Sequence, residues 1–176
     1  MLIIMLALLG TAAVLLRRNQ ALALAELLPG RFVALSSVGV GIELLGLRVG
    51  GELGHGLVVI GLAALIVSCW PLRRWAGGWL LIVGLSLNAI AMAFHGHMPI
   101  TPQVLEQIGV THPIGTVLGG SKDIVAAGWL AQWLGDRFIT AIPSLRYTIA
   151  WSLGDLLLIG GICRAATGQV RHGLSA

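Results

Sequence analysis

The stretch MAFHGHMPITP, residues 92–102, gathers side chains that could bind a metal. His95, His97 and Met98 fall within four positions, at the point where a long apolar run ends. Imidazole and thioether groups are suitable ligands for copper, and a histidine can also ligate haem iron or the magnesium of chlorophyll. A complete site needs a third ligand, for which His112 is the nearby candidate. One hypothesis is therefore a metal, haem or pigment site formed by these three histidines.

The same stretch has a second interpretation, in which a membrane helix simply ends at the interface with water. Residues two apart on a helix do not point the same way, so His95 and His97 could converge only in an extended turn. Pro99 also prevents the helix from continuing. We favour this second interpretation, in which the histidines are polar interface residues and no cofactor is predicted.

A second group of polar residues interrupts the apolar runs themselves. Glu43, Asn88 and Asp155 each lie inside such a run, and a rise of about 1.5 Å per residue places them near one depth, close to Ser86 and Ser152. A carboxylate at mid-bilayer costs at least about 2.5–3.5 kcal/mol, so these side chains must face protein or water. They could form a midplane pocket for a small lipophilic molecule or a proton. They could equally be a hydrogen-bonded cluster that holds helices together, which we favour because no span offers them a positively charged partner.

The elements that position these residues follow from the composition. The chain has 176 residues, of which 57% are hydrophobic and only 10% are charged, whereas soluble domains carry about 25% charged residues. So few charges cannot cover a soluble particle of this size. The basic residues are also scattered, which excludes a nucleic-acid patch. The composition predicts one all-α domain over residues 1–176, a multi-pass helical bundle whose main partner is the lipid bilayer.

Five apolar runs are long enough to be considered as membrane spans. They cover residues 1–16, 32–49, 56–72, 75–95 and 145–163. The first run precedes Arg17 and Arg18, whereas a secretory signal places its positive charge first. We therefore expect a retained first helix that enters the membrane from outside.

Basic residues predict the orientation of these spans. With the N-terminus outside, the inner flanks hold Arg17, Arg18, Arg31, Arg73, Arg74, Arg164 and Arg171, and the outer flanks hold Arg48, Lys122, Arg137 and Arg146. Because positive residues accumulate on the cytoplasmic side, the N-terminus is predicted outside and the C-terminus inside a bacterial inner membrane. Residues 96–144 then form a long outer segment.

The outer segment contains two helical patterns. Thr101 and Pro102 are typical of the first positions of a short helix, which Gly109 would end. Residues 123–136, DIVAAGWLAQWLGD, space Trp129 and Trp133 four apart, which predicts an amphipathic helix at the outer interface. Short interfacial helices are therefore expected between the fourth and fifth spans.

Four short motifs occur in order within residues 80–163: GLSLNAIAMAFHGHMPI, VLEQIG, WLGD followed by IP, and SLGDLLLIGGI. Together they resemble those of an uncharacterised bacterial family of small membrane proteins, domain-of-unknown-function family 5317. The positions that match are Asn88, Met98, Pro99, Gly135, Asp136, Ser152, Gly154 and Asp155. The family turn carries Asn-Gly-Gly before its Met-Pro step, whereas this chain has His95-Gly96-His97. The resemblance implies a membrane architecture and no particular activity.

These observations predict a non-enzymatic protein, because no nucleophile elbow, phosphate loop, zincin or dinucleotide motif is present. We expect a small structural or accessory subunit that packs against other membrane proteins of a larger respiratory or photosynthetic complex. The alternatives are binding or transport of a small lipophilic molecule at the Glu43, Asn88 and Asp155 level, and a haem- or pigment-binding subunit.

Overall fold

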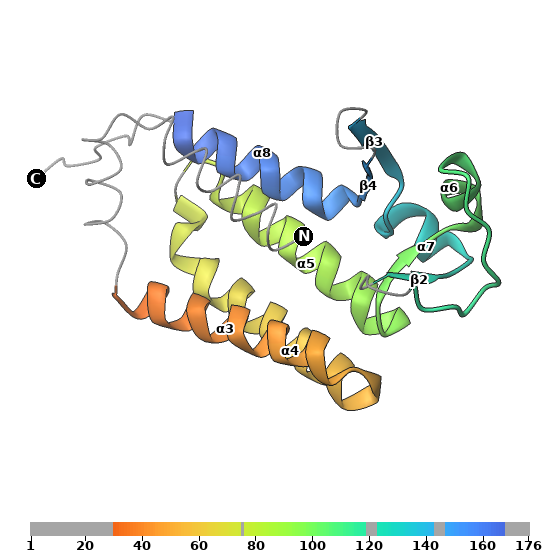
Figure 1. Cartoon of the computed structure of the whole chain (residues 1–176). Coiled ribbons are helices and arrows are strands. Elements are labelled where there is room, and N and C mark those ends of the chain that lie inside the picture. The colour runs from red at the N-terminus through yellow and green to blue at the C-terminus, as the bar shows by residue number, and fades with distance from the viewer. Residues whose placement is uncertain (1–29, 75, 119–122, 143–146, 168–176) are drawn as a thin grey trace, which may run out of the picture.

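The computed structural model describes residues 30–74, 76–118, 123–142 and 147–167, and the first predicted span, residues 1–16, lies outside them. A bundle of long helices carries a small cap of strands and short helices at one end (Figure 1). The bundle contains α3 (Gly30–Val49), α4 (Gly51–Cys69) with the 3-10 helix η1 (Trp70–Arg74), α5 (Gly78–His95) and α8 (Leu153–Thr167). The cap contains β1 (Met98–Ile100), α6 (Pro102–Gln107), β2 (Asp123–Val125), α7 (Trp129–Leu134), β3 (Phe138–Ile142) and β4 (Tyr147–Trp151).

Helices α3 and α4 form a hairpin in which glycines bring the two backbones into contact. A methyl group built on Gly46 would lie 2.6 Å from the carbonyl oxygen of Gly54, and one on Gly61 would lie 2.7 Å from that of Gly39. Any larger residue at these positions would force the helices apart. Small residues are the usual means by which helices approach closely where lipid removes the hydrophobic drive for packing.

Helices α5 and α8 repeat this arrangement, although they are far apart in the sequence. A methyl group on Gly84 would lie 2.7 Å from the Gly154 carbonyl oxygen, and one on Gly161 would lie 3.0 Å from that of Gly77. The two contacts are seven positions apart on each helix, as they are in the α3–α4 pair. The bundle thus contains two helix pairs, and in each pair two glycine contacts lie seven positions apart.

Larger apolar side chains join the two pairs. The buried residues of this bundle core are Val58 and Leu62 on α4, Leu85, Ala91 and Met92 on α5, Leu158 on α8, and Met98 on β1. The contact between α4 and α5 therefore depends on side-chain packing rather than on direct backbone contact.

The cap has its own small core next to the ends of α5 and α8 (Figure 1). Strands β1 and β2 are parallel, with Ile100 opposite Val125, and β3 and β4 form an antiparallel ladder from Phe138 opposite Trp151. Ile100 and Val125 are buried with Val104 and Leu105 of α6. Met98 is buried in the bundle core and Ile100 in the cap core, so strand β1 contributes a side chain to each.

The structure corrects the prediction for the fifth span and for the outer segment. Residues 147–151, predicted within the helical span 145–163, are strand β4, and α8 begins only at Leu153. At about 1.5 Å per residue, the 15 residues of α8 cover about 22 Å. The outer segment also contains strands, which a purely helical prediction misses. Alternating side chains and a turn between two short runs give much weaker sequence signals than a long apolar helix.

Other elements of the outer segment are confirmed. Helix α6 begins at Pro102 with Thr101 at its N-cap position, and Gly109 follows it with a φ of +78°. The helix predicted over residues 123–136 is confirmed only for α7, because Asp123–Val125 is strand β2.

Among the described residues, two helical segments are long and apolar enough to cross a membrane. They are Gly51–Arg74 and Gly78–His95, which correspond to the predicted spans 56–72 and 75–95. Only 28% and 39% of their apolar windows are buried within the protein. Helix α3 confirms that residues 32–49 are helical.

Candidate functional site

Three of the five polar residues predicted at one depth form a buried hydrogen-bonded cluster. Ser152 precedes α8, and its hydroxyl accepts the backbone N–H of Asp155 at 3.0 Å. The Asp155 carboxylate accepts the backbone N–H of Ser152 at 3.2 Å. This reciprocal pair is a capping box, which satisfies backbone donors that have no partner within the helix. The sequence Ser-x-Gly-Asp is therefore explained in part as a helix start.

Asn88 of α5 joins this capping box to the neighbouring helix. Its amide nitrogen donates to Asp155 at 2.9 Å, and its amide oxygen accepts the Ser152 hydroxyl at 2.9 Å. The three side chains are 0%, 5% and 0% exposed for Asn88, Asp155 and Ser152. Buried polar groups must be hydrogen-bonded, and this closed ring satisfies that requirement across two helices.

Gly154 completes the cluster because a side chain there would collide with the Asn88 amide oxygen. Each specified residue of the Ser-x-Gly-Asp motif thus has a physical role at the contact between α5 and α8. Ser152 and Asp155 cap the helix and bind Asn88, and Gly154 lets the helix come close enough for both bonds.

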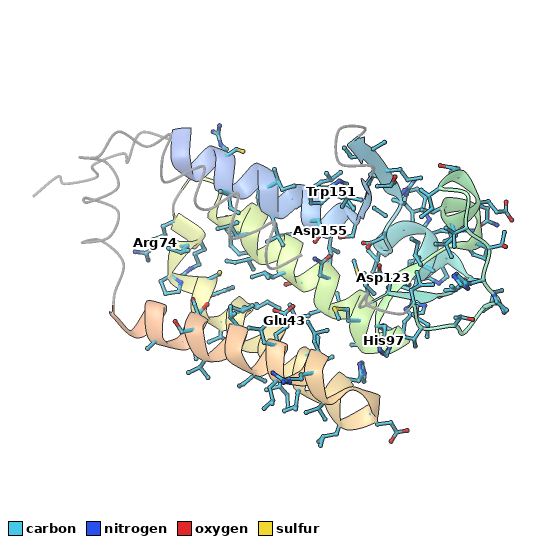
Figure 2. The ribbon with its side chains drawn as sticks, in the orientation of Figure 1. Glu43, Arg74, His97, Asp123, Trp151 and Asp155 are labelled. Atoms are coloured by element: carbon cyan, nitrogen blue, oxygen red, sulfur yellow. The ribbon has the colours of Figure 1, made fainter. Side chains whose placement is uncertain are left out.

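The structure also places the other two predicted residues, Ser86 and Glu43. The Ser86 hydroxyl donates to the Ile82 carbonyl at 2.8 Å, so this hydrogen bond lies within α5. Glu43 is buried on α3, where its backbone lies against Gly61 of α4, in the other helix pair (Figure 2). Sequence reasoning grouped all five residues by depth, and the structure places them on α3, on α5 and at the start of α8.

The two outer motifs meet in the cap. The Asp136 backbone N–H donates to the Pro99 carbonyl at 2.9 Å, and a side chain on Gly135 would collide with that same carbonyl. Met98, Pro99, Gly135 and Asp136 are all buried. The Met-Pro and Gly-Asp steps therefore fix where β1 lies against the end of α7, and Met98 acts as a core residue.

The candidate metal ligands do not gather at one point. His95 bonds through Nδ1 to the Ala91 carbonyl of its own helix at 3.0 Å, and His112 is exposed in the loop between α6 and β2. Within the described part of the chain, no three residues among His, Cys, Asp and Glu are placed to hold a metal ion together.

His97 has a partner that sequence reasoning missed. It lines a cavity of about 60 Å³ together with His55, which lies in the first turns of α4. The His55 ring donates through Nδ1–H to the Gly96 carbonyl at 2.9 Å. A signal for this contact was present, since the predicted topology puts the start of the third span and the end of the fourth at the same outer face.

A comparison with known families places these motifs in context. The model of DUF5317, a family of unknown function, matches residues 18–167. The chain belongs to this family. The match includes the Asn88 cluster and the Pro99 contact, and it also extends into the N-terminal half, where the sequence motifs gave no signal. Comparisons with curated proteins and with solved structures found no match.

Proposed function

We propose that the chain is a multi-pass protein of the bacterial inner membrane with five helical spans. The support is the outward direction of its apolar side chains. Leu53, Ile60 and Val67 on α4 are 56–70% exposed, and Phe94 on α5 is 71% exposed. The core helix of a soluble protein would bury such side chains, whereas a lipid-facing helix exposes them.

Tryptophans at both ends of the bundle support the same proposal. Trp70 and Trp79 pack edge to face with ring centroids 5.8 Å apart, where α4 ends and α5 begins. Both are about half exposed. At the cap, Trp129 and Trp133 are 68% and 59% exposed. Tryptophan is enriched at both membrane–water interfaces, so this arrangement fits a bundle with one interface at each end.

Charge supports a cytoplasmic location for the end opposite the cap. Arg73 and Arg74 of η1 lie there, with Arg164 in the last turn of α8. The acidic residues Glu52, Glu106, Asp123 and Asp136 lie towards the other end or in the cap, which also holds Arg137. The positive-inside rule then orients the cap outward, with the N-terminus outside and the C-terminus in the cytoplasm.

Cysteine labelling tests this orientation. In a background with Cys69 and Cys163 replaced by serine, Thr111→Cys in the cap loop should react with a membrane-impermeant maleimide in intact cells. Arg74→Cys should react only after the cells are opened. The reverse pattern, or equal labelling of both, would disprove the orientation.

Within this architecture we propose a structural or accessory role in a larger membrane complex, such as a respiratory or photosynthetic assembly. The observation that carries this proposal is an apolar loop surface, defined by Val110, Ile114 and Val117, which are 38%, 65% and 46% exposed. This surface belongs to the cap, beyond the long helices, so lipid does not explain it. Exposed apolar patches commonly mark contacts with other proteins. The internal bonding of Asn88, Ser152 and Asp155 also favours a structural role for that cluster over transport.

Purification in a mild detergent tests the accessory role. The chain should elute with other membrane proteins, and Ile114→Asp together with Val117→Asp should release it while its melting temperature is retained. Thr111→Asp, compared with each single aspartate variant as well as the double one, is the matched control, because it adds one negative charge at an exposed polar position of the same loop. A wild-type chain that remains stable and alone at every detergent concentration would contradict the proposal.

A further inference from the structure

The cavity beside His97 is too small for an organic ligand and has the donors for a small ion. It lies between the glycine-rich turn that joins α3 to α4 and the last turn of α5. Small-molecule sites usually measure about 300–1,000 Å³, whereas this cavity measures about 60 Å³. A volume of this size accommodates an ion or a few waters.

The His55 hydrogen bond prepares its imidazole to act as a ligand. A carbonyl oxygen can only accept a hydrogen bond, so the contact with Gly96 places a proton on Nδ1 of His55. In the neutral ring, the lone pair then resides on Nε2. Histidines that ligate metals commonly donate their other ring N–H to a carbonyl in this way, which fixes both tautomer and ring orientation.

Two further residues with donor side chains line the same cavity. They are His97, which carries an imidazole, and Met92, which carries a thioether. Met92 is one helical turn before Gly96, whose N–H donates to the Met92 carbonyl at 2.8 Å, so the two residues lie on the same side of α5.

The donor set selects the type of ion. Among the described residues that line the cavity, none carries a carboxylate, so calcium and magnesium lack their preferred ligands. Two neutral imidazoles and one thioether form a soft, uncharged set, which suits a monovalent cuprous ion better than zinc. We propose that this cavity binds one cuprous ion through His55, His97 and Met92.

Anaerobic titration of the purified full chain with cuprous ion against a chromophoric chelator tests the site. We expect one tightly held equivalent. His55→Asn should weaken binding at least about tenfold, comparable with or greater than the loss on removing an orienting partner, while its amide nitrogen, which takes the place of Nδ1, can still donate to Gly96 and preserve the fold. His97→Ala should have a similar effect. Met92→Leu should weaken cuprous binding with little change in any zinc affinity.

His95→Ala is the matched control, because His95 is two residues from His97 but bonds to its own helix. It should bind copper as the wild type does, and each variant should retain the wild-type melting temperature without metal. X-ray absorption of the loaded protein should show both nitrogen and sulfur neighbours. The proposal fails if the wild type binds no more copper than a His55→Asn, His97→Ala double variant, if His95→Ala loses binding equally, or if no sulfur neighbour is seen.

Discussion

Replacing Ser152 by alanine should destabilise the protein far more than the same replacement at Ser86. The Ser152 hydroxyl makes two buried bonds, one accepted from the Asp155 N–H and one donated to Asn88. Loss of an N-cap side chain costs about 0.5–2 kcal/mol, and loss of a buried hydrogen bond costs about 0.5–1.5 kcal/mol. We expect Ser152→Ala to lower the free energy of unfolding by about 1–3.5 kcal/mol.

Ser86→Ala removes only a bond to the preceding turn of α5. Such bonds slightly destabilise helices, so the change should lie within about 0.5 kcal/mol of zero. Unfolding by sodium dodecyl sulfate in mixed micelles, followed by tryptophan fluorescence, would measure both variants. Combining Ser152→Ala with Asn88→Ala should show a coupling of at least about 0.5 kcal/mol. Equal losses for the two serines, or additive effects of Ser152 and Asn88, would refute the role of the cluster.

Glycine substitutions provide two further tests of helix contact. Gly46→Ala should destabilise the α3–α4 pair by about 1–3 kcal/mol through overpacking, whereas Gly41→Ala should be neutral or stabilising, because nothing lies within 4 Å of an added methyl group. Gly154→Ala should disrupt the Asn88 bonds and lower the melting temperature, whereas at Gly160 the nearest atom, Leu80 Cδ1, lies at an ordinary 4.0 Å. In each pair, equal effects of the two alanines in thermal unfolding would count against direct backbone contact.

The sequence predicted the long helices well and the cap poorly. Apolar runs of nearly twenty residues identify α4 and α5 to within five residues of their ends, because so long an apolar run is typical of a membrane-spanning or fully buried helix. Strand β4 was missed since its residues Tyr147–Trp151 are mostly apolar and adjoin the apolar α8, so the two merge into one run. Only the capping motif, Ser152 followed by Asp155 three positions later, marks the true helix start.

The candidate site was predictable in membership but not in geometry. Hydropathy identified Asn88, Ser152 and Asp155 as buried polar residues, and the preference for a structural cluster agrees with their mutual bonds. Which side chains bond to one another depends on which helices are neighbours and which way each side chain turns, and depth along a span does not determine either. His55 was overlooked because it stands alone in the sequence, forty-one positions from the Gly96 carbonyl that it contacts.

The contact between α5 and α8 imposes an order in time on biosynthesis. The α3–α4 hairpin can close as soon as its second helix emerges. Asn88, in contrast, is synthesised with α5, before its partners Ser152 and Asp155, which follow it by 64 and 67 positions. At about 5–20 residues per second of synthesis, that delay is about 3–13 s. During this interval the amide has neither Ser152 nor Asp155, so it must bond to water or to earlier parts of the chain until α8 is made.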